Sequence, residues 1–449
     1  MNTHRLSNAY VAELPPMEVR TVTLVVDTGD LADRTLHKLC DSMYQRVHAR
    51  AGALVSACAA VSSEYGIPIL QRRVCVTPLE RVAEGFGPED LVNIARTLDG
   101  AAANARLDFI GGYFVRAAHA LSTTSRQMIA ALPAILSQTE RVQTAVEAAS
   151  SQAGVNLDVV ELLGYKVKEA AEATADRNGI GASQLAVMAN VPTDGPPVAG
   201  ACPVEGWGDL TVHVSVSAMG PIQHAVRQRL AENPQASLSV LSGDIKTATF
   251  QATRVAELIG KAIAERIGAD FGRIDLSLAP TIRSGQTVSE LLQQLGVSNF
   301  GAPGTAAALL LVLSAIRAGG AFASAECASE ASILLPVLRD SGLVSATEAG
   351  SLAVEHLARL SAVGAQGLDL VPVEGCVTAA TLSAVMADQL ATAVVNGRMT
   401  VVRLIPVPGK SAGDRVSFGR GLGDGVVLAL PSSGDAGLIH RTGRIPPLG

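Results

Sequence analysis

The stretch RIDLSLAPTIRSG, residues 273–285, carries side chains that could act on a small charged molecule. Asp275 and Ser277 alternate along a short apolar run, so both would point to the same face of a strand. A proline ends the run, and Thr281 and Arg283 follow in the turn. A guanidinium placed there can bind a carboxylate or a phosphate, while Asp275 can serve as an acid or a base. The alternative is a buried aspartate that only accepts hydrogen bonds from loop amides.

A second group of reactive side chains lies in AECASEAS, residues 325–332. If this stretch is helical, Glu326 and Glu330 are four residues apart and share one face. Neighbouring carboxylates push their pKa values apart, so one can act as an acid and the other as a base. Cys327 could be a nucleophile if its thiolate were stabilised. The alternative is an exposed glutamate pair beside a buried thiol.

A polar stripe follows the strand-like stretch VHVSVSAMG, residues 212–220. His213, Ser215 and Ser217 occupy every second position and would therefore share one face. A neutral histidine beside hydroxyl groups could move protons. The same histidine could instead lie on an outer face that a helix covers.

The loop AGACPVEGWGD, residues 199–209, contains the only tryptophan of the chain. Glu205 and Trp207 could form the wall of a pocket, with one carboxylate and one aromatic surface. The alternative is a turn whose indole ring fills a gap in the core. The residue types fit both interpretations.

Asp369, in the stretch GLDLVP, resembles Asp275 because it is a carboxylate inside an apolar strand. Such a group must be paired, or it must face a ligand or a metal. A divalent metal site would need Asp275, Asp369 and a glutamate within reach. The chain has no GxGxxG, Walker, HExxH or GxSxG motif, so we expect no nucleotide cofactor and predict no cofactor at all.

Composition excludes several classes of protein. The 449 residues carry a net charge of −6 without a run of basic residues, which argues against a nucleic-acid partner. The six cysteines are dispersed and fit reduced thiols of a cytosolic protein. The N-terminal residues lack the apolar core of a secretory signal, and the most apolar stretch, residues 306–316, is too short to span a bilayer. We therefore expect a soluble cytoplasmic protein.

Short apolar runs alternate with helical patterns along the chain. Apolar residues three and four apart predict helices over residues 31–66, 137–154 and 247–272. Alternation of this kind predicts an α/β architecture with parallel strands that helices cover. Predicted strands occupy residues 19–26, 185–191, 211–217, 273–278, 367–373, 400–407 and 425–430.

With these stretches in view, the chain resembles the uncharacterised bacterial UPF0210 or DUF711 family. The longest matching segment is TRVAELIGKAIAERIGADFGRIDLSLAPTIRSGQTVSELLQQLG, residues 253–296. Further matches are GIPILQRRVCVTPLE, LDFIGGYFVRAA, AVGAQGLDLVPVEG and the segment over residues 395–430. The resemblance covers roughly residues 19–430.

The resemblance implies a fold similar to that of glycyl radical enzymes. That fold is a ten-stranded α/β barrel made of two parallel five-stranded half-sheets, which are set antiparallel to each other. We therefore predict a single domain over residues 1–449, with half-barrels over 19–190 and 191–397 and a β-rich tail over 398–449. The tail segment DRVSFGRG lacks the glycine–tyrosine pair of the radical enzymes, so radical chemistry is not expected.

The chain departs from the family pattern at positions where polar side chains are expected. Pro203 and Pro303 stand where the pattern has histidines, Trp207 replaces a glutamate and Ser324 replaces a cysteine. The departures indicate a specialised member, or one whose active site has been lost.

We predict an enzyme that acts on a small polar metabolite by acid–base chemistry, in secondary metabolism. An isomerase, lyase or cyclase fits best, and a hydrolase comes next. The second hypothesis is a non-catalytic ligand-binding or regulatory protein. We also expect a homodimer that has a small-molecule ligand and no nucleic-acid or membrane partner. The predicted catalytic residues are Asp275, Glu326, Glu330 and His213, and the predicted substrate-binding residues are Arg283, Ser277, Thr281, Glu205, Trp207 and Cys327.

Overall fold

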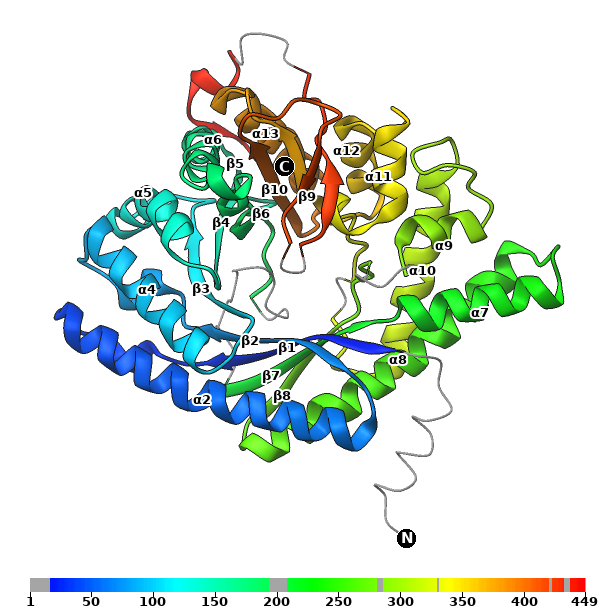
Figure 1. Ribbon diagram of the computed structural model, residues 1–449, viewed down its shortest axis with the longest axis horizontal. Coiled ribbons are helices and arrows are strands. Elements are labelled where there is room, and N and C mark those ends of the chain that lie inside the picture. Colours follow the sequence, from blue (N-terminus) through cyan, green and yellow to red (C-terminus); the bar gives the residue numbers. More distant parts are fainter. Residues whose placement is uncertain are drawn as a thin grey trace.

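The structure is a computed structural model that describes residues 17–193, 208–280, 286–328, 331–419, 422–431 and 437–448. Figure 1 shows strands toward the middle of the molecule and helices around the outside. The main strands are β1 (Glu18–Val26), β2 (Ile69–Val76), β3 (Phe109–Arg116), β4 (Val142–Ser150), β6 (Leu185–Ala189), β7 (Leu210–Ser217), β8 (Asp270–Asp275), β9 (Gly367–Glu374) and β10 (Thr400–Val407).

The described residues form twelve α-helices. They are α2 (Leu36–Tyr65), α3 (Leu79–Val82), α4 (Pro88–Asn104), α5 (Thr123–Gln138), α6 (Leu157–Glu172), α7 (Met219–Glu232), α8 (Leu238–Ile267), α9 (Val288–Gln294), α10 (Thr305–Ala323), α11 (Ser341–Glu348), α12 (Val354–Val363) and α13 (Ala379–Asn396). Short strands β5 (Gly154–Asn156), β11 (Arg415–Ser417), β12 (Asp424–Val426) and β13 (Arg444–Ile445) complete the fold.

The large sheet has the strand order β8-β7-β1-β2-β3-β4-β6-β10-β9. Its five central strands, β1 to β4 and β6, are parallel to one another. The pairs β7–β8 and β9–β10 are each parallel within the pair, but they lie antiparallel to β1 and β6, respectively. The predicted mixed α/β architecture with parallel strands is therefore confirmed.

The two edge strands, β8 and β9, approach a common segment without forming a continuous sheet. Leu278, just after β8, makes a single parallel bridge to Ile333, and Ile333 makes another to Ala365, just before β9. Ile274 of β8 also bridges Cys327. In the described part of the chain no strand joins β8 to β9, so the sheet is not closed and the predicted barrel is not confirmed.

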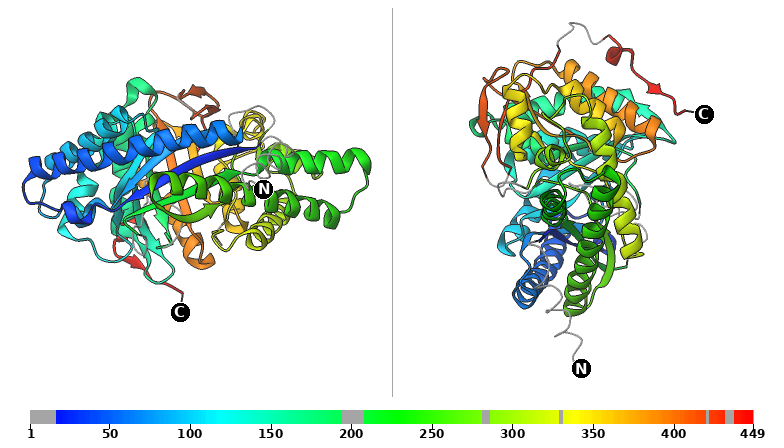
Figure 2. Two further views of the ribbon diagram at one scale, coloured as in Figure 1. Left: turned by 90° about the horizontal axis from the view of Figure 1, so that it is seen from below. Right: turned by 90° about the vertical axis from the view of Figure 1, so that its right-hand side faces the viewer.

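Helices α2 and α8 show how the outer layer packs on the sheet. Each has 30 residues and ends at a glycine with a left-handed backbone, Gly66 and Gly268, where a Cβ atom would add strain. The two helices contact each other along the molecule (Figure 2). Gly260 of α8 faces the sheet, and a Cβ atom there would lie 2.2 Å from the Phe271 ring. The absence of a side chain lets α8 lie directly on β7 and β8.

The helix predicted over residues 137–154 is wrong. The structure ends α5 at Gln138 and places strand β4 over Val142–Ser150. The alanines and the glutamate of VQTAVEAAS favour a helix locally, but eight of the nine residues of β4 are buried and the strand pairs on both sides. Tertiary burial therefore outweighs the local preference.

One helix in the described residues, α10, is long and apolar enough to cross a membrane. It spans 19 residues and is longer than the apolar stretch that the sequence suggests, but 44% of its apolar window is buried inside the molecule. A core helix of a soluble protein has the same properties, so this helix is weak support for a membrane span. The rest of the molecule has the packed α/β core of a soluble protein.

Candidate active site

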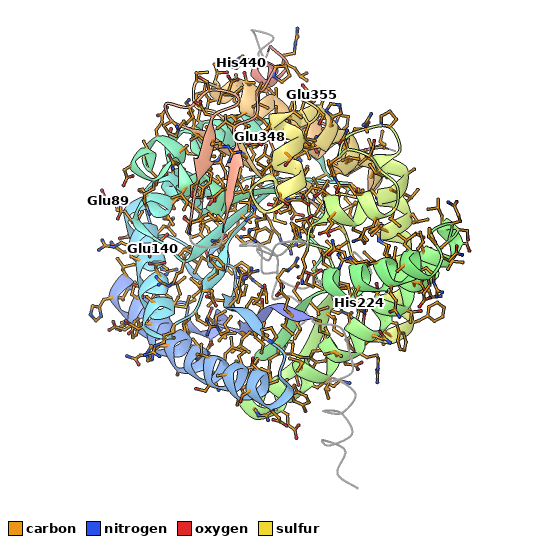
Figure 3. The ribbon with its side chains drawn as sticks, turned by 45° about the vertical axis from the view of Figure 1, so that its right-hand side comes forward. Glu89, Glu140, His224, Glu348, Glu355 and His440 are labelled. Atoms are coloured by element: carbon orange, nitrogen blue, oxygen red, sulfur yellow. The ribbon has the colours of Figure 1, made fainter. Side chains whose placement is uncertain are left out.

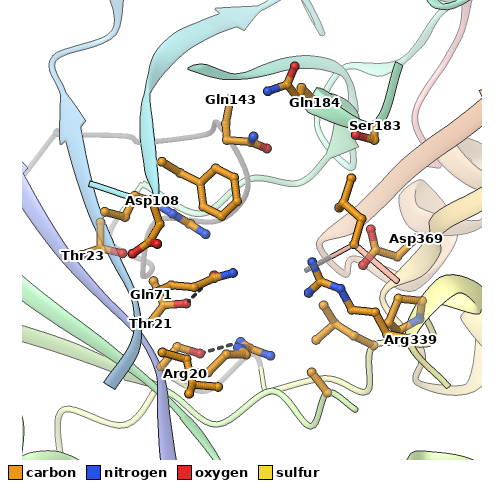
Figure 4. Close-up of a pocket in the computed structure, with 18 of the residues that line it drawn as sticks. Arg20, Thr21, Thr23, Gln71, Asp108, Gln143, Ser183, Gln184, Arg339 and Asp369 are labelled. Carbon is orange, nitrogen blue, oxygen red and sulfur yellow. Dashed lines mark hydrogen bonds between the residues drawn. The ribbon is translucent and has the colours of Figure 1, made fainter. Parts of the chain in front are cut away.

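A cavity of about 660 Å³ lies between the central strands and the β9–β10 pair. Figure 4 shows side chains entering it from opposite walls, with Arg20 and Gln71 on one side and Arg339 and Asp369 on the other. Such a volume accommodates a small metabolite. The polar side chains that line the cavity are therefore the candidates for binding and chemistry.

Asp275 lies in this cavity at the end of β8, and its carboxylate accepts hydrogen bonds from three described groups. Arg20 Nη2 and Ser215 Oγ each donate to Asp275 Oδ2, both at 2.7 Å. The backbone N–H of Ser277 donates to Oδ1 at 2.8 Å. The sheet register brings these groups together, because Ser215 of β7 pairs with Asp275 on one side and with Thr21 on the other.

The environment of Asp275 keeps its carboxylate ionised. Burial alone would raise the pKa of Asp275, but Arg20 and the hydrogen bonds from Ser277 and Ser215 outweigh it, so the pKa lies below its usual value. A carboxylate held in this way is a poor proton acceptor at neutral pH. Its evident effect is to hold the guanidinium of Arg20 at the cavity wall.

Asp369, on the opposite wall, has a different hydrogen-bonding pattern. Arg403 Nε donates a hydrogen bond to Asp369 Oδ1 at 2.6 Å, and Arg403 Nη2 forms an ion pair with the same oxygen at 2.5 Å. The Asp369 side chain is only 5% exposed, and no described group donates to its Oδ2 atom. The second oxygen of this nearly buried carboxylate is therefore available to accept a hydrogen bond from a ligand.

The backbone beside Asp369 adopts a conformation that non-glycine residues rarely take. Leu370 has φ of +50°, in the left-handed region. The pairing of β9 with β10 shifts register at this point, between Val402 and Leu404. Strained backbone of this kind costs roughly 1–3 kcal/mol and is concentrated at functional sites. Here the strained residue directly follows Asp369, whose side chain lines the cavity together with that of Arg403.

Arg339 ends the short 3-10 helix η4 (Val337–Arg339) and points into the cavity (Figure 4). Its side chain makes no hydrogen bond or ion pair with any described residue, and its Nε atom is buried. Burial, together with nearby Arg403 and Arg20, lowers the pKa of Arg339 to about 10, although Asp369 opposes the shift. The guanidinium is still charged at neutral pH, and no carboxylate among the described residues pairs with it.

His213 lines the same cavity from β7 and is 2% exposed. Its Nδ1 atom accepts the backbone N–H of Arg273 at 3.0 Å, which places the ring proton on Nε2. Burial, reinforced by the charge of Arg273, lowers the pKa of His213 to about 3. The imidazole is neutral at physiological pH and is not readily protonated.

The structure separates the remaining described candidates from the cavity. Glu326 is partly exposed and pairs with Arg273 at 3.3 Å, outside the cavity lining. Burial, with a smaller contribution from the charge of Asp275, raises the pKa of the Cys327 thiol to about 12. Ser277 is buried behind Asp275, and its carbonyl oxygen accepts from Arg20 at 3.3 Å. The remaining predicted residues, Glu330, Thr281, Arg283, Glu205 and Trp207, lie outside the described residues.

The described residues contain no group of three or more His, Cys, Asp or Glu side chains that could hold a metal ion. Asp275 and Asp369 each pair with an arginine. Whether the protein uses a cofactor is untested by the structure, and the prediction of none stays a prediction.

Three arginines that line the cavity, Arg20, Arg339 and Arg403, were not predicted from the sequence. A signal was present for two of them, because Arg20 in EVRTVT and Arg403 in VVRLIPV interrupt apolar strands. A charged residue at such a position must be paired or must face a polar space. Arg339 has no comparable pattern, and only the packing of η4 places it in the cavity.

Comparison with known proteins gives consistent matches along the chain. The family described as "Uncharacterised ACR (DUF711)" matches residues 12–424. A UPF0210 protein of Syntrophobacter fumaroxidans is 41% identical over 442 residues, which is 98% of this chain and 97% of the relative. A UPF0210 protein of Methanosarcina acetivorans is 38% identical over 98% of this chain and 94% of its own length. The predicted family is thereby confirmed.

Proposed function

Because the chain belongs to the uncharacterised UPF0210 (DUF711) family, we propose its function from the cavity itself: an enzyme that acts on a small polar metabolite by acid–base chemistry. Proton transfer in an isomerase, lyase or cyclase reaction needs a carboxylate within hydrogen-bonding reach of the substrate. The observation that carries the proposal is Asp369, which lines the cavity and whose Oδ2 atom accepts no hydrogen bond from a described residue.

The surroundings of Asp369 favour this role over a purely structural one. Arg403 holds one carboxylate oxygen by a hydrogen bond from Nε and an ion pair with Nη2, and it leaves the second oxygen available. A proton-transferring group needs such fixed geometry, because misplacement by about 1 Å slows a reaction strongly. The strained backbone at Leu370 supports the same interpretation. In this account Asp275 positions Arg20, and Asp369 transfers the proton.

The second candidate is a ligand-binding or regulatory protein that uses the same cavity without catalysis. Three observations favour it. Asp275 is fully hydrogen-bonded, His213 remains neutral, and the Cys327 thiol remains protonated at neutral pH. The replacement of expected histidines by Pro203 and Pro303 agrees with a lost active site.

The proposal includes a ten-stranded barrel architecture around the cavity. The bridges of Ile333 to Leu278 and to Ala365 support it, since they set this segment parallel to both edge strands. A specialised reaction in secondary metabolism, a cytoplasmic location and a homodimer complete the proposal. The sequence departures support the first of these.

Conversion of a metabolite by the purified protein tests the enzyme proposal. We expect a metabolite extract incubated with the wild-type protein to lose one small polar compound and to gain a product, as followed by mass spectrometry. The Asp369→Asn variant should slow this conversion by roughly 10²–10⁴-fold, because general acid–base catalysis contributes that much.

The matched control for this test is Asp41→Asn on α2, since the Asp41 side chain is 66% exposed and pairs only with exposed His37. This variant should convert the metabolite at the wild-type rate. Equal conversion by Asp369→Asn and wild type would contradict the assignment of Asp369. Ligand binding by a wild-type protein that converts nothing would favour the regulatory alternative.

A further inference from the structure

Building on the proposed function, we infer that the metabolite is a carboxylic acid whose carboxylate binds between Arg339 and Arg20. The inference names a substrate class for the cavity. It depends on three observations. Arg339 is a cation without a partner among the described residues, Arg20 is a second cation on the facing wall, and the side chains around them carry a net positive charge.

The cation without a partner among the described residues is Arg339. A partly buried guanidinium without an anion is unfavourable, and charged groups in protein interiors are normally paired. Among the described residues, Asp369 is the nearby carboxylate that acts on Arg339 electrostatically, but Arg403 holds its Oδ1 atom. An anion supplied by the ligand would complete the site.

The second cation is Arg20, which enters the cavity from the opposite wall (Figure 4). Its Nη2 atom is fixed by Asp275 at 2.7 Å, and Nη1 donates to the Ser277 carbonyl at 3.3 Å. The guanidinium is therefore held in one orientation before a ligand arrives. Its Nε–H makes no hydrogen bond with a described residue and remains a donor. Preorganised arginines recognise planar anions with little loss of side-chain freedom.

The charge balance favours a carboxylate over a phosphate. The charges of Arg20 and Arg403 both act on Arg339 in the cavity, and two carboxylates, Asp275 and Asp369, pair with Arg20 and Arg403. These five side chains leave one positive charge, and the six arginines and five carboxylates among all the described lining residues give the same excess. One carboxylate neutralises it, whereas a phosphate ester with a charge of about −1.5 to −2 would leave an excess of negative charge beside Asp369.

The neighbouring walls fit the remainder of such an acid. Gln71, Gln143 and Gln184 present amide groups around the cavity, and Thr21 adds a hydroxyl group (Figure 4). Neutral donors and acceptors suit the hydroxyl, keto or amide groups of a small polar metabolite. The anion is thus expected between Arg339 and Arg20, with the reacting carbon next to it and within reach of Asp369.

Ligand-observed NMR titration of the full-length protein tests the inference with lactate, pyruvate and malate as probes. Lactamide and inorganic phosphate serve as the comparison ligands. We expect saturable binding of at least one acid, with lactamide and phosphate binding more weakly. Arg339→Gln should weaken acid binding by about 10–100-fold, because a charge-assisted hydrogen bond is lost. Arg50→Gln, an exposed arginine of α2, should bind as the wild type does.

A stability measurement separates a binding role of Arg339 from a structural one. Without a ligand, Arg339→Gln should raise the melting temperature by roughly 1–3 °C, because an unpaired desolvated charge is removed. A fall in melting temperature would overturn the inference. It would also be overturned if phosphate bound more tightly than every acid, if no acid bound to the wild type, or if Arg339→Gln bound acids unchanged.

Failure of this inference can be distinguished from failure of the proposed function. Asp369→Asn should retain acid binding while it loses conversion, because the Arg339 and Arg20 side chains are intact. Acid binding without any conversion by the wild type contradicts only the enzyme proposal. Conversion of a metabolite that carries no carboxylate contradicts only the inference.

Discussion

Replacing Asp275 with alanine is expected to lower the free energy of unfolding by roughly 3–5 kcal/mol, because a buried ion pair would lose one partner. Arg20 would keep its charge but lose its 2.7 Å contact to the carboxylate. The Ser215 hydroxyl and the Ser277 amide would lose their acceptor as well. Urea unfolding at neutral pH, followed by circular dichroism, measures the change.

Two further variants show whether this loss comes from the ion pair. Asp41→Asn removes an exposed aspartate and should change the free energy of unfolding by less than about 0.5 kcal/mol. The double variant Asp275→Ala/Arg20→Met removes both charges and should recover part of the stability, since no unpaired cation remains. An Asp275→Ala protein as stable as the wild type would show that Arg20 does not depend on this carboxylate.

Acidification from pH 7 to pH 5 should destabilise the protein through His213 by about 2 kcal/mol. In the folded protein, burial and Arg273 hold the pKa of His213 at about 3, whereas the unfolded chain has the ordinary value of 6.5. Below pH 6.5 the unfolded state therefore binds the additional proton. The stabilising contribution of the neutral imidazole is present above pH 6.5 and is lost progressively as the pH falls toward 3.

The His213→Gln variant tests this pH dependence. A glutamine can accept the Arg273 N–H with its side-chain oxygen but does not titrate, so the difference in stability between pH 7 and pH 5 should become smaller. His224→Gln is the control, because His224 of α7 lies on the outside of the molecule (Figure 3). Asp275 has a lowered pKa and loses stability in the same direction, but below its ordinary value of 3.8. An unchanged pH dependence in His213→Gln would contradict the assignment.

Much of the architecture could be predicted from the sequence, because the apolar strands β1, β7 and β10 carry a clear local signal. The strand β4 could not, since its alanines favour a helix and only burial between β3 and β6 makes it a strand. Closure of the sheet also depends on long-range contacts. Single bridges at Ile333 leave no pattern in the sequence that would reveal how β8 and β9 are related.

The candidate site was predictable in its carboxylates but not in their partners. Asp275 and Asp369 stand out as charged residues in apolar strands, and both line the cavity. The residue that pairs with Asp275 is 255 positions away in the chain, and no local rule connects Arg20 to it. These contacts also decide which carboxylate is available for reaction. Both oxygens of Asp275 accept hydrogen bonds from described residues, whereas only one oxygen of Asp369 does.

Solvent-deuterium exchange tests the central claim most directly, because a carboxylate that moves a proton from carbon will also exchange it with solvent. The wild-type protein, incubated in D2O with the acids that bind it, should introduce deuterium at one carbon-bound position, as detected by mass spectrometry. Asp369→Asn should reduce the exchange rate by at least about 100-fold, while Asp41→Asn should not change it. A wild-type protein that binds an acid but neither exchanges nor converts it would contradict the account.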